Sequence, residues 1–253
     1  MDPRACLTLS NICLHFGALR AIDDVSLQVM QGERHALLGT NGAGKTTMFN
    51  VITGDLPATS GSVLFEQHEV TKLPPWERCR LGMGRTYQTP LLFTSLTVLE
   101  NIFIASRDAH RGRLALRKID AGSDWVAQAL QLCREVGIGA LAQTRVDQLS
   151  HGQKKQLELG MALASKPRLL LLDEPAAGLS PDDRRAFVAL IAALPRSLTL
   201  LFVEHDMDVA LNLADRVTVM KDGQLLASGT PAQIRANEDV RRLYLGEPMK
   251  VAA

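Results

Sequence analysis

One glycine-rich segment constrains the fold more than any other feature of the chain. Residues 39–46 read GTNGAGKT and fit the pattern G-x-x-x-x-G-K-[ST] without a mismatch. The glycines let backbone N–H groups turn inward around phosphates, and the lysine reaches the β- and γ-phosphates. The apolar run 35–38 precedes the segment, and a helix is expected over 46–53, whose N-terminus adds partial positive charge. The sequence therefore predicts a loop that holds a nucleoside triphosphate through Gly39, Thr40, Asn41, Gly42, Ala43, Gly44, Lys45 and Thr46.

The composition excludes several other classes of protein. With 253 residues, 46% hydrophobic and 22% charged, the chain is long enough for one large α/β domain and is neither disordered nor fibrous. The 28 basic and 27 acidic residues give no reason to expect nucleic-acid binding. No apolar stretch is long enough to span a membrane, and no signal peptide is readable. The four scattered cysteines suit reduced thiols in a cytosolic protein.

Strand and helix patterns alternate on both sides of a helical stretch. Apolar runs at 169–172 and 198–203 predict buried strands, and 182–194 is typical of an amphipathic helix. Asp222-Gly223 is a strong hairpin signal, and Thr230-Pro231 is expected to open the last helix as its N-cap and first residue. This order predicts a largely parallel sheet with helices around it and an all-helical insertion.

Four polar residues at strand ends are candidates for the chemistry of the bound nucleotide. Asp173 is the natural partner of Mg²⁺ together with the Thr46 hydroxyl, and Glu174 can take a proton from the attacking water. The two acids could instead cap a helix before Pro175. Gln88 can bind Mg²⁺ and sense the γ-phosphate, although such an amide is often a solvated loop residue. His205 can donate a hydrogen bond to the γ-phosphate, or be structural.

The segment Leu149-Ser150-His151-Gly152-Gln153 resembles the L-S-G-G-Q signature of the ABC-type ATPases. It lies twenty residues before the strand that ends in Asp173-Glu174, as in that family, and the other motifs follow in family order over nearly the whole chain. The resemblance implies a P-loop NTPase of the ABC type with a mostly parallel sheet core, an antiparallel β subdomain and an α-helical insertion. It implies a single ABC ATPase domain over 1–253, with the nucleotide-binding core at 1–88 and 162–253. The helical subdomain, at 89–161, carries the signature.

The same resemblance assigns further residues. Ser150, Gly152 and Gln153 would contact the γ-phosphate of ATP held by another protomer, so that a head-to-tail dimer shares two ATP molecules. His151 replaces the first signature glycine. Residues 177–180 resemble the D-loop, with serine where aspartate is common. Thr47 would extend the phosphate contacts. Phe16 matches in position the aromatic that stacks on adenine, and packing in the core is the competing interpretation.

Two further segments, 173–181 and 229–247, look like the uptake subfamily for branched-chain amino acids, urea and amides. The implied function is the ATP-hydrolysing subunit of a bacterial importer, peripheral on the cytoplasmic face of the inner membrane. The implied partners are a second ABC ATPase subunit, identical or paralogous, two integral-membrane permeases and, indirectly, a periplasmic solute-binding protein, with no nucleic acid. Two alternatives are the ATPase of a lipopolysaccharide-type exporter and a soluble ABC ATPase that is not coupled to transport.

The apolar residues that follow Gln88 have two interpretations. Leu91, Leu92 and Phe93 stand where solvent-facing residues would otherwise be expected. They could be buried inside the helical insertion. They could instead form a groove that receives a short cytoplasmic helix of a permease.

Overall fold

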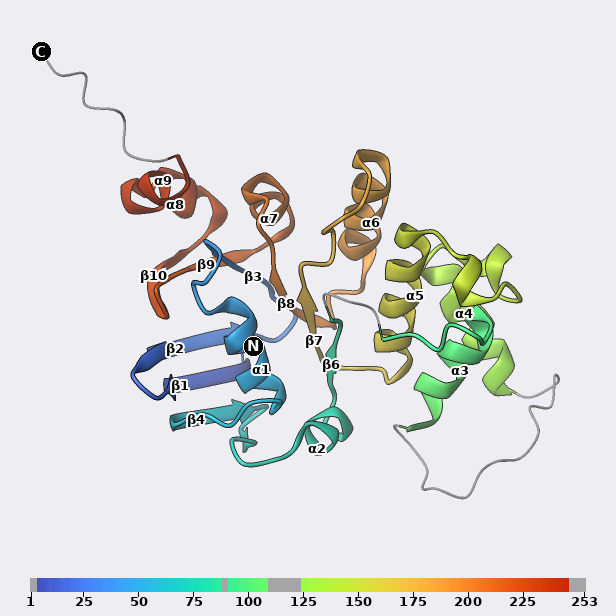
Figure 1. The fold of residues 1–253 in the computed structure, drawn as a ribbon, viewed down its shortest axis with the longest axis horizontal. Coiled ribbons are helices and arrows are strands. Elements are labelled where there is room, and N and C mark those ends of the chain that lie inside the picture. The colour runs from blue at the N-terminus through green and yellow to red at the C-terminus, as the bar shows by residue number, and fades with distance from the viewer. Residues whose placement is uncertain (1–3, 88–90, 109–123, 246–253) are drawn as a thin grey trace, which may run out of the picture. The chain divides into compact units, whose positions relative to one another are not determined.

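The computed structural model describes residues 4–87, 91–108 and 124–245 (Figure 1). The chain divides into two compact units, residues 1–75 with 199–253 and residues 76–198, and each is described by itself. The predicted helical subdomain falls inside the second unit, and its bounds at 89 and 161 stay a prediction. Within the described ranges, no helix combines the length and the apolar character that crossing a bilayer requires.

An antiparallel sheet opens the first unit. Its strands have the order β2-β1-β4-β5. Leu7, Leu9, Ile12 and Leu14 of β1 are buried, and the alternation of side chains shifts by one residue between Leu9 and Ile12, where the pairing with β2 is irregular. The bounds of the four strands are β1 (Ala5–Phe16), β2 (Leu19–Met30), β4 (Ser60–Phe65) and β5 (His68–Glu69).

A second set of strands in this unit carries the phosphate loop. β3 pairs in parallel with β8 on one side and β9 on the other, and β10 pairs antiparallel to β9. All residues of β3 are buried, as expected for a strand covered on both faces. The bounds are β3 (Arg34–Gly39), β8 (Thr199–Val203), β9 (Arg216–Lys221) and β10 (Gln224–Gly229).

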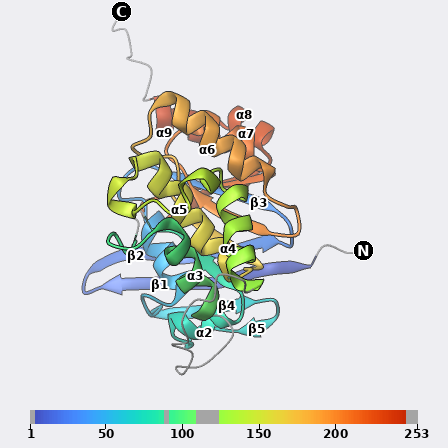
Figure 2. The same ribbon diagram turned by 90° about the vertical axis from the view of Figure 1, so that its right-hand side faces the viewer.

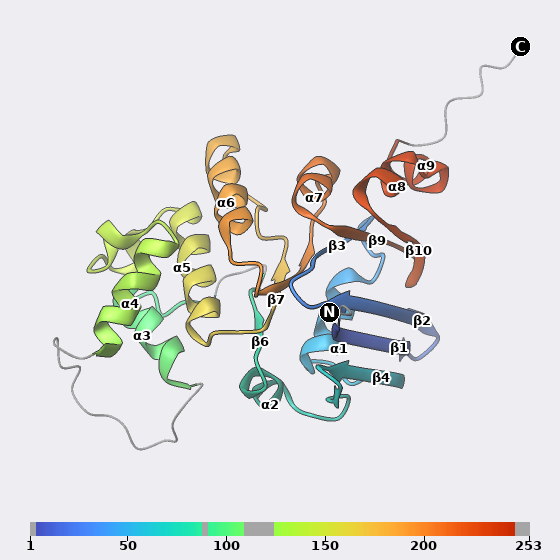
Figure 3. The same ribbon diagram turned by 180° about the vertical axis from the view of Figure 1, so that it is seen from behind.

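The helices of the first unit are α1 (Lys45–Thr53), α7 (Met207–Leu213), α8 (Pro231–Ala236) and α9 (Glu238–Leu245). Helix α1 contacts β2 and β3 (Figure 3). Thr230 is an N-cap and Pro231 a first helical residue, as predicted, but the expectation of one last helix is wrong. The Asn237 side chain accepts the backbone N–H groups of Asp239 and Val240, each at 3.0 Å, and this cap starts a second helix.

The second unit contains one parallel strand pair and most of the helices. β6 pairs with β7 through Gly84 and Leu170, and every residue of β7 is buried. Helix α3 packs against both α4 and α5 (Figure 2). A Cβ on Gly160 of α5 would lie 3.1 Å from the Ile102 side chain, so the glycine permits this close approach. The elements are α2 (Pro75–Arg80), β6 (Met83–Arg85), α3 (Val98–Asp108), α4 (Asp124–Glu135), two 3₁₀ turns (Gly139–Leu141 and Val146–Gln148), α5 (His151–Ala164), β7 (Leu169–Asp173) and α6 (Pro181–Ala193).

Candidate functional site

The phosphate loop occupies the turn between β3 and α1, where the sequence predicts it. Lys45 is the first residue of α1, and its side chain is buried. Its ammonium donates hydrogen bonds to the carbonyl oxygens of Gly39 and Thr40, at 2.7 and 2.9 Å. The Lys45 ammonium is thus held over the loop. Phosphate oxygens can replace the two carbonyl oxygens as its hydrogen-bond acceptors, because charged oxygens accept more strongly than carbonyl oxygens.

The start of α1 is shaped to receive an anion. Gly44 is the N-cap, has φ 99° and makes no side-chain cap, and no acidic residue stands in the first turn. A Cβ at Gly44 would lie 2.8 Å from the carbonyl oxygen of Ala21, so glycine is required for space as well as for φ. The first N–H groups and the positive end of the helix dipole therefore have no competing carboxylate.

A hairpin distant in sequence braces the loop, a contact that sequence reasoning missed. The N–H of Gly223 donates to the carbonyl oxygen of Ala43 at 3.2 Å, and the N–H of Asp23 donates to the carbonyl oxygen of Gly223 at 2.9 Å. The Asp222-Gly223 signal predicts the β9–β10 turn correctly, and both residues have positive φ. Nothing local in that dipeptide indicates that the turn also links β2 to the phosphate loop.

Two more predicted residues lie in the first unit. Phe16 ends β1 and is 52% exposed, so the core interpretation of this side chain is wrong. His205 is exposed and follows β8 by two residues, next to buried Glu204. Asp206 caps α7 by accepting the N–H groups of residues 208 and 209. An exposed aromatic at a strand end and an exposed imidazole are both open to a ligand.

Asp173 ends β7 in the second unit, and Glu174 follows it directly. Asp173 is only 1% exposed, and Nη2 of Arg85 lies 3.4 Å from its Oδ2. Burial raises the pKa of Asp173, and the nearby Arg85 guanidinium opposes that shift. The other oxygen, Oδ1, is buried with no hydrogen-bond partner among the described residues. A buried carboxylate oxygen left without a donor fits a ligand for a hard cation.

Glu174 differs from its neighbour in backbone and exposure. It is partly exposed and has φ 48°, a left-handed conformation that a non-glycine residue adopts at a cost. Its carbonyl oxygen accepts the N–H of Ala177 at 3.0 Å. The residues after Pro175 form a turn rather than a helix, so the alternative of a helix cap is wrong.

The signature segment begins α5. Ser150 is the N-cap of this helix: its hydroxyl accepts the N–H of Gln153 at 3.3 Å, while the Gln153 side chain accepts the N–H of Ser150 at 2.9 Å. Sequence reasoning missed this capping box, although the S-x-x-Q spacing is its known pattern. A Cβ on Gly152 would lie 3.3 Å from Cγ of Asp183, so Gly152 lets α6 approach.

The departure at His151 has a packing role in the structure. Its Nε2 lies 3.2 Å from the position that a Cβ on Gly178 would take, and Gly178 has φ 74°. The imidazole thus covers a backbone position of the segment that resembles the D-loop. Ser180 of that segment is the N-cap of α6, and its hydroxyl donates to Oδ2 of Asp183 at 2.7 Å. Residues 177–180 are therefore held by helix capping within the chain.

Gln88 lies outside the described residues, but the residues that directly precede it are described. The backbone N–H of Tyr87 donates to Oε1 of Glu158 at 2.7 Å, and Arg85 lies over the Tyr87 ring at 4.8 Å. Glu158 is buried on α5, and burial raises the pKa of its carboxyl. The signature helix is therefore tied directly to the segment that leads to Gln88. The sequence shows only that Glu158 is an acid within a helical pattern, and nothing in that pattern identifies Tyr87 as its hydrogen-bond partner.

The apolar run after Gln88 is largely on the surface. Leu91 and Phe93 are 68% and 51% exposed, whereas Leu92 is partly buried. Buried Asn101 accepts the N–H of Phe93 at 2.9 Å and donates to its carbonyl oxygen at 3.1 Å, which anchors the backbone beneath the exposed ring. The core interpretation is wrong for Leu91 and Phe93.

Comparisons with known proteins identify the family of the chain. A family model described as "ABC transporter" matches residues 22–177, and one described as "Branched-chain amino acid ATP-binding cassette transporter" matches residues 224–249. The chain is 36% identical over 249 residues to the high-affinity branched-chain amino acid transport ATP-binding protein LivG of Escherichia coli K12, covering 95% of this chain and 98% of that one. It is 37% identical over 252 residues to BraF of Pseudomonas aeruginosa PAO1, with coverage of 96% and 99%.

Solved structures give the same answer for the fold. A nucleotide-free ATP-binding cassette from an ABC transporter matches with a TM-score of 0.84 at 32% identity, covering 96% of this chain and all of that one. An ATP-binding cassette in its ADP conformation matches with a TM-score of 0.85 at the same identity and coverage. The fold and the phosphate loop define the class of nucleotide-binding P-loop ATPase cassettes. The chain belongs to the ABC transporter family, which confirms the predicted family, fold class and ATPase activity.

Proposed function

We propose that the chain is the subunit that hydrolyses ATP for a bacterial importer of branched-chain amino acids or a related small solute such as urea or an amide. The supporting observation is the similarity to LivG and BraF, which runs through the phosphate loop and on to the C-terminal segment 224–249. In this proposal the solute is chosen by a periplasmic binding protein and two permeases. The chain works at the cytoplasmic face of the inner membrane.

ATP binds through the first unit. Backbone N–H groups of residues 39–47 and the Lys45 ammonium hold the phosphates, and the exposed ring of Phe16 stacks on adenine. Mg²⁺ would be held by the Thr46 hydroxyl, Gln88 and Asp173, and when bound it would neutralise phosphate charge. The unpartnered buried Oδ1 of Asp173 supports this set of ligands.

Hydrolysis uses residues at the ends of β7 and β8. Glu174 takes the proton from the attacking water, because Glu174 is partly exposed and can reach a water molecule. Asp173 is buried and is assigned to the metal instead. His205 donates to the γ-phosphate, and Gln88 senses the γ-phosphate. Each role needs a group that solvent or a ligand can reach, and the exposure of His205 supports its assignment.

A second ATPase subunit completes each site. Ser150, Gly152 and Gln153 at the start of α5 bind the γ-phosphate of ATP held by that partner, so that only the triphosphate bridges two subunits. The segment Leu91–Phe93 docks a cytoplasmic helix of a permease. The exposure of Leu91 and Phe93 above a backbone anchored by Asn101 supports the docking surface.

The test is uptake by the whole transporter. The chain is produced with permeases and a solute-binding protein from its own source, in a host that lacks its own branched-chain, urea and amide uptake systems. Uptake of labelled leucine, urea and acetamide is compared with the same system carrying Glu174→Gln. The unmodified system is expected to take up one of these solutes, and the Glu174→Gln system is expected to lose that uptake. ATP hydrolysis by the assembled complex without uptake of any of them would contradict the proposal.

A further inference from the structure

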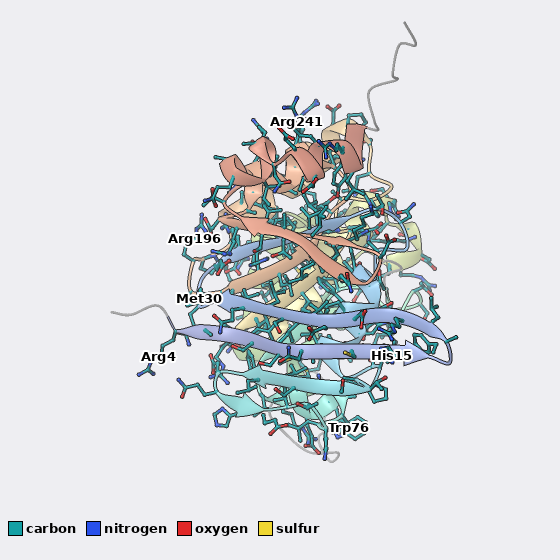
Figure 4. All side chains as sticks on the ribbon, turned by 90° about the vertical axis from the view of Figure 1, so that its left-hand side faces the viewer. Arg4, His15, Met30, Trp76, Arg196 and Arg241 are labelled. Carbon is teal, nitrogen blue, oxygen red and sulfur yellow. The ribbon has the colours of Figure 1, made fainter. Side chains whose placement is uncertain are left out.

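Three residues with metal-binding side chains meet near the turn that joins β1 and β2. Cys13 and His15 are two residues apart on β1 and share one face of the strand, and Asp23 stands on the adjacent strand β2. One donor atom from each, a sulfur, a ring nitrogen and a carboxylate oxygen, lie within 4.8 Å of one another. Figure 4 labels His15 at the end of β1 that is remote from Arg4.

His15 presents a buried nitrogen that lacks a protein partner. Its Nε2 is shielded from solvent and forms no hydrogen bond with any part of the chain that the structure describes. The backbone of the same residue is held in place, because its N–H donates to Oγ1 of Thr59 at 3.0 Å. Buried polar atoms are rarely left unpaired, and a neutral imidazole nitrogen is a common metal ligand.

The sulfur of Cys13 already accepts one hydrogen bond. The backbone N–H of Asp24 donates to Sγ at 3.3 Å. The thiolate is the form that binds metals, and the backbone donor fixes the position of the sulfur beside β2. Cys13 is only partly buried, so an ion from solvent can reach it.

Asp23 is oriented for the same cluster. Its Oδ2 accepts a hydrogen bond from Nε2 of Gln224 at 3.0 Å, a contact that fixes the direction of the carboxylate in the way that outer contacts orient metal ligands. The Arg20 guanidinium donates to both carboxylate oxygens of Asp23, at 3.5 Å to Oδ1 and 3.4 Å to Oδ2. The Arg20 side chain is largely exposed, so the pair adds little stability and the guanidinium can move into solvent when a cation binds.

We propose that Cys13, His15 and Asp23 form a binding site for Zn²⁺, with water in the fourth position. A thiolate, an imidazole and a carboxylate together suit this ion, whereas Mg²⁺ and Ca²⁺ prefer oxygen ligands alone. In a tetrahedral zinc site the ligand atoms lie roughly 3.3–3.7 Å apart, so the cluster needs to contract by about 1 Å. The ion would join β1 to β2 next to Phe16, and it is separate from the oxygen ligands proposed for Mg²⁺.

Direct metal titration of the full-length chain tests the site. The metal-free, nucleotide-free protein is titrated with Zn²⁺ against a chromophoric chelator, and separately with Co²⁺ to follow a thiolate-to-cobalt charge-transfer band. One Zn²⁺ per chain is expected. Cys13→Ser, His15→Ala and Asp23→Asn should each weaken binding at least about tenfold, and Cys13→Ser should remove the band.

Matched variants exclude surface binding. Cys79→Ser removes an exposed thiol, and Asp24→Asn changes the acid beside Asp23. Both should retain the zinc affinity and the cobalt band. Absence of stoichiometric binding would overturn the proposal, as would loss of binding in Cys79→Ser with retention in Cys13→Ser. If Cys13→Ser fails to fold, unchanged zinc affinity in His15→Ala and Asp23→Asn would overturn it equally.

Discussion

The N-termini of α1 and α5 are both proposed to bind phosphate, yet they are built differently. Helix α1 begins at Gly44 with no side-chain cap, whereas α5 begins with a complete capping box between Ser150 and Gln153. Neither helix has an acidic residue in its first turn. Helix α6 offers a contrast, because it starts with a serine cap followed by Asp182 and Asp183.

The difference in capping indicates which groups of each helix would bind the phosphates of ATP. At α1 the first N–H groups face no competing side chain, so a nucleotide can bind to a single chain. At α5 the Ser150 hydroxyl and the Gln153 side chain are engaged within the helix, so the isolated end is already stable. Both contacts use side-chain oxygens as acceptors, so the Ser150 O–H and the Gln153 amide N–H groups can still donate to the γ-phosphate of a partner's ATP. The proposed contact at α5 therefore uses side-chain donors that the cap holds in place, whereas the contact at α1 uses backbone N–H groups.

The largest effect is expected from removing the proposed base. Glu174→Gln should lower steady-state ATP hydrolysis by about 10²–10⁴-fold while ATP binding is retained, because only the proton acceptor is lost. ATP should then persist long enough to link the α1 site of one subunit with the α5 end of another. Size-exclusion chromatography should show a dimer with ATP and a monomer with ADP. Near-normal hydrolysis in this variant would exclude Glu174 as the base.

The next effect concerns α1 alone. Lys45→Ala should weaken ATP binding about 10–100-fold, because it removes a charge-assisted contact with phosphate. Equilibrium binding of a fluorescent ATP analogue measures the change. Arg20→Ala is a suitable control, since it removes an exposed cation from the same unit. If Lys45→Ala and the unmodified chain bind ATP with equal affinity, Lys45 does not contribute to nucleotide binding.

A smaller effect is expected from α5, and here the two helix ends are compared directly. In the Glu174→Gln background, Ser150→Ala should weaken the ATP-dependent dimer about tenfold, with ATP affinity of the monomer unchanged. It should also lower stability by about 1 kcal/mol through loss of the cap.

Thr230→Ala is the matched control for this prediction. It removes the hydroxyl from the same kind of capping box, formed with Gln233 at the start of α8, so a similar loss of stability is expected without weakening of the dimer. Dimerisation is measured by sedimentation and stability by urea unfolding. Equal weakening of the dimer in both variants would mean that capping alone explains the effect.

The smallest effect concerns the link between α5 and Tyr87. Burial raises the pKa of Glu158 above its usual range, so protonation favours the folded state. This acid should therefore contribute most stability below its unfolded pKa, and the contribution should fall as pH rises through the folded pKa. Glu158→Gln keeps an oxygen acceptor for the Tyr87 N–H and removes the charge.

Urea unfolding at several pH values measures this difference. The free energy of unfolding of the unmodified chain, relative to Glu158→Gln, should decline as pH rises from about 4.5 toward neutral. The variant should be at least as stable as the unmodified chain at pH 7. A relative stability that increases with pH would show that the Glu158 carboxylate is stabilised in its charged form.

Local patterns predicted the elements that carry the motifs. The glycine-rich loop placed α1 correctly to within one residue, and the leucine run placed β7 correctly. Such patterns work because buried strands and helix ends impose their own spacing on neighbouring residues. The break at Asn237 was missed, since a cap inside a helical pattern can either start a new helix or be tolerated within a longer one.

Contacts between distant residues explain most of what the sequence did not predict. The Gly223 N–H reaches the carbonyl oxygen of Ala43, and Glu158 reaches the N–H of Tyr87. The imidazole of His151 covers Gly178. In each case the residue type was readable but its partner was not, because one sequence carries no record of which distant backbone groups a side chain will meet.

The spacing of short motifs is enough to predict an ABC-type ATPase, because phosphate chemistry demands particular residues at fixed short spacings. Only the folded structure shows which of those residues are held and which are exposed. It exposed Phe16 and Phe93, buried Asp173 with one oxygen unpartnered, and brought Cys13, His15 and Asp23 together across two strands. Burial and partner choice depend on how strands pair and helices pack, and those depend on contacts throughout each unit rather than on neighbours in the chain.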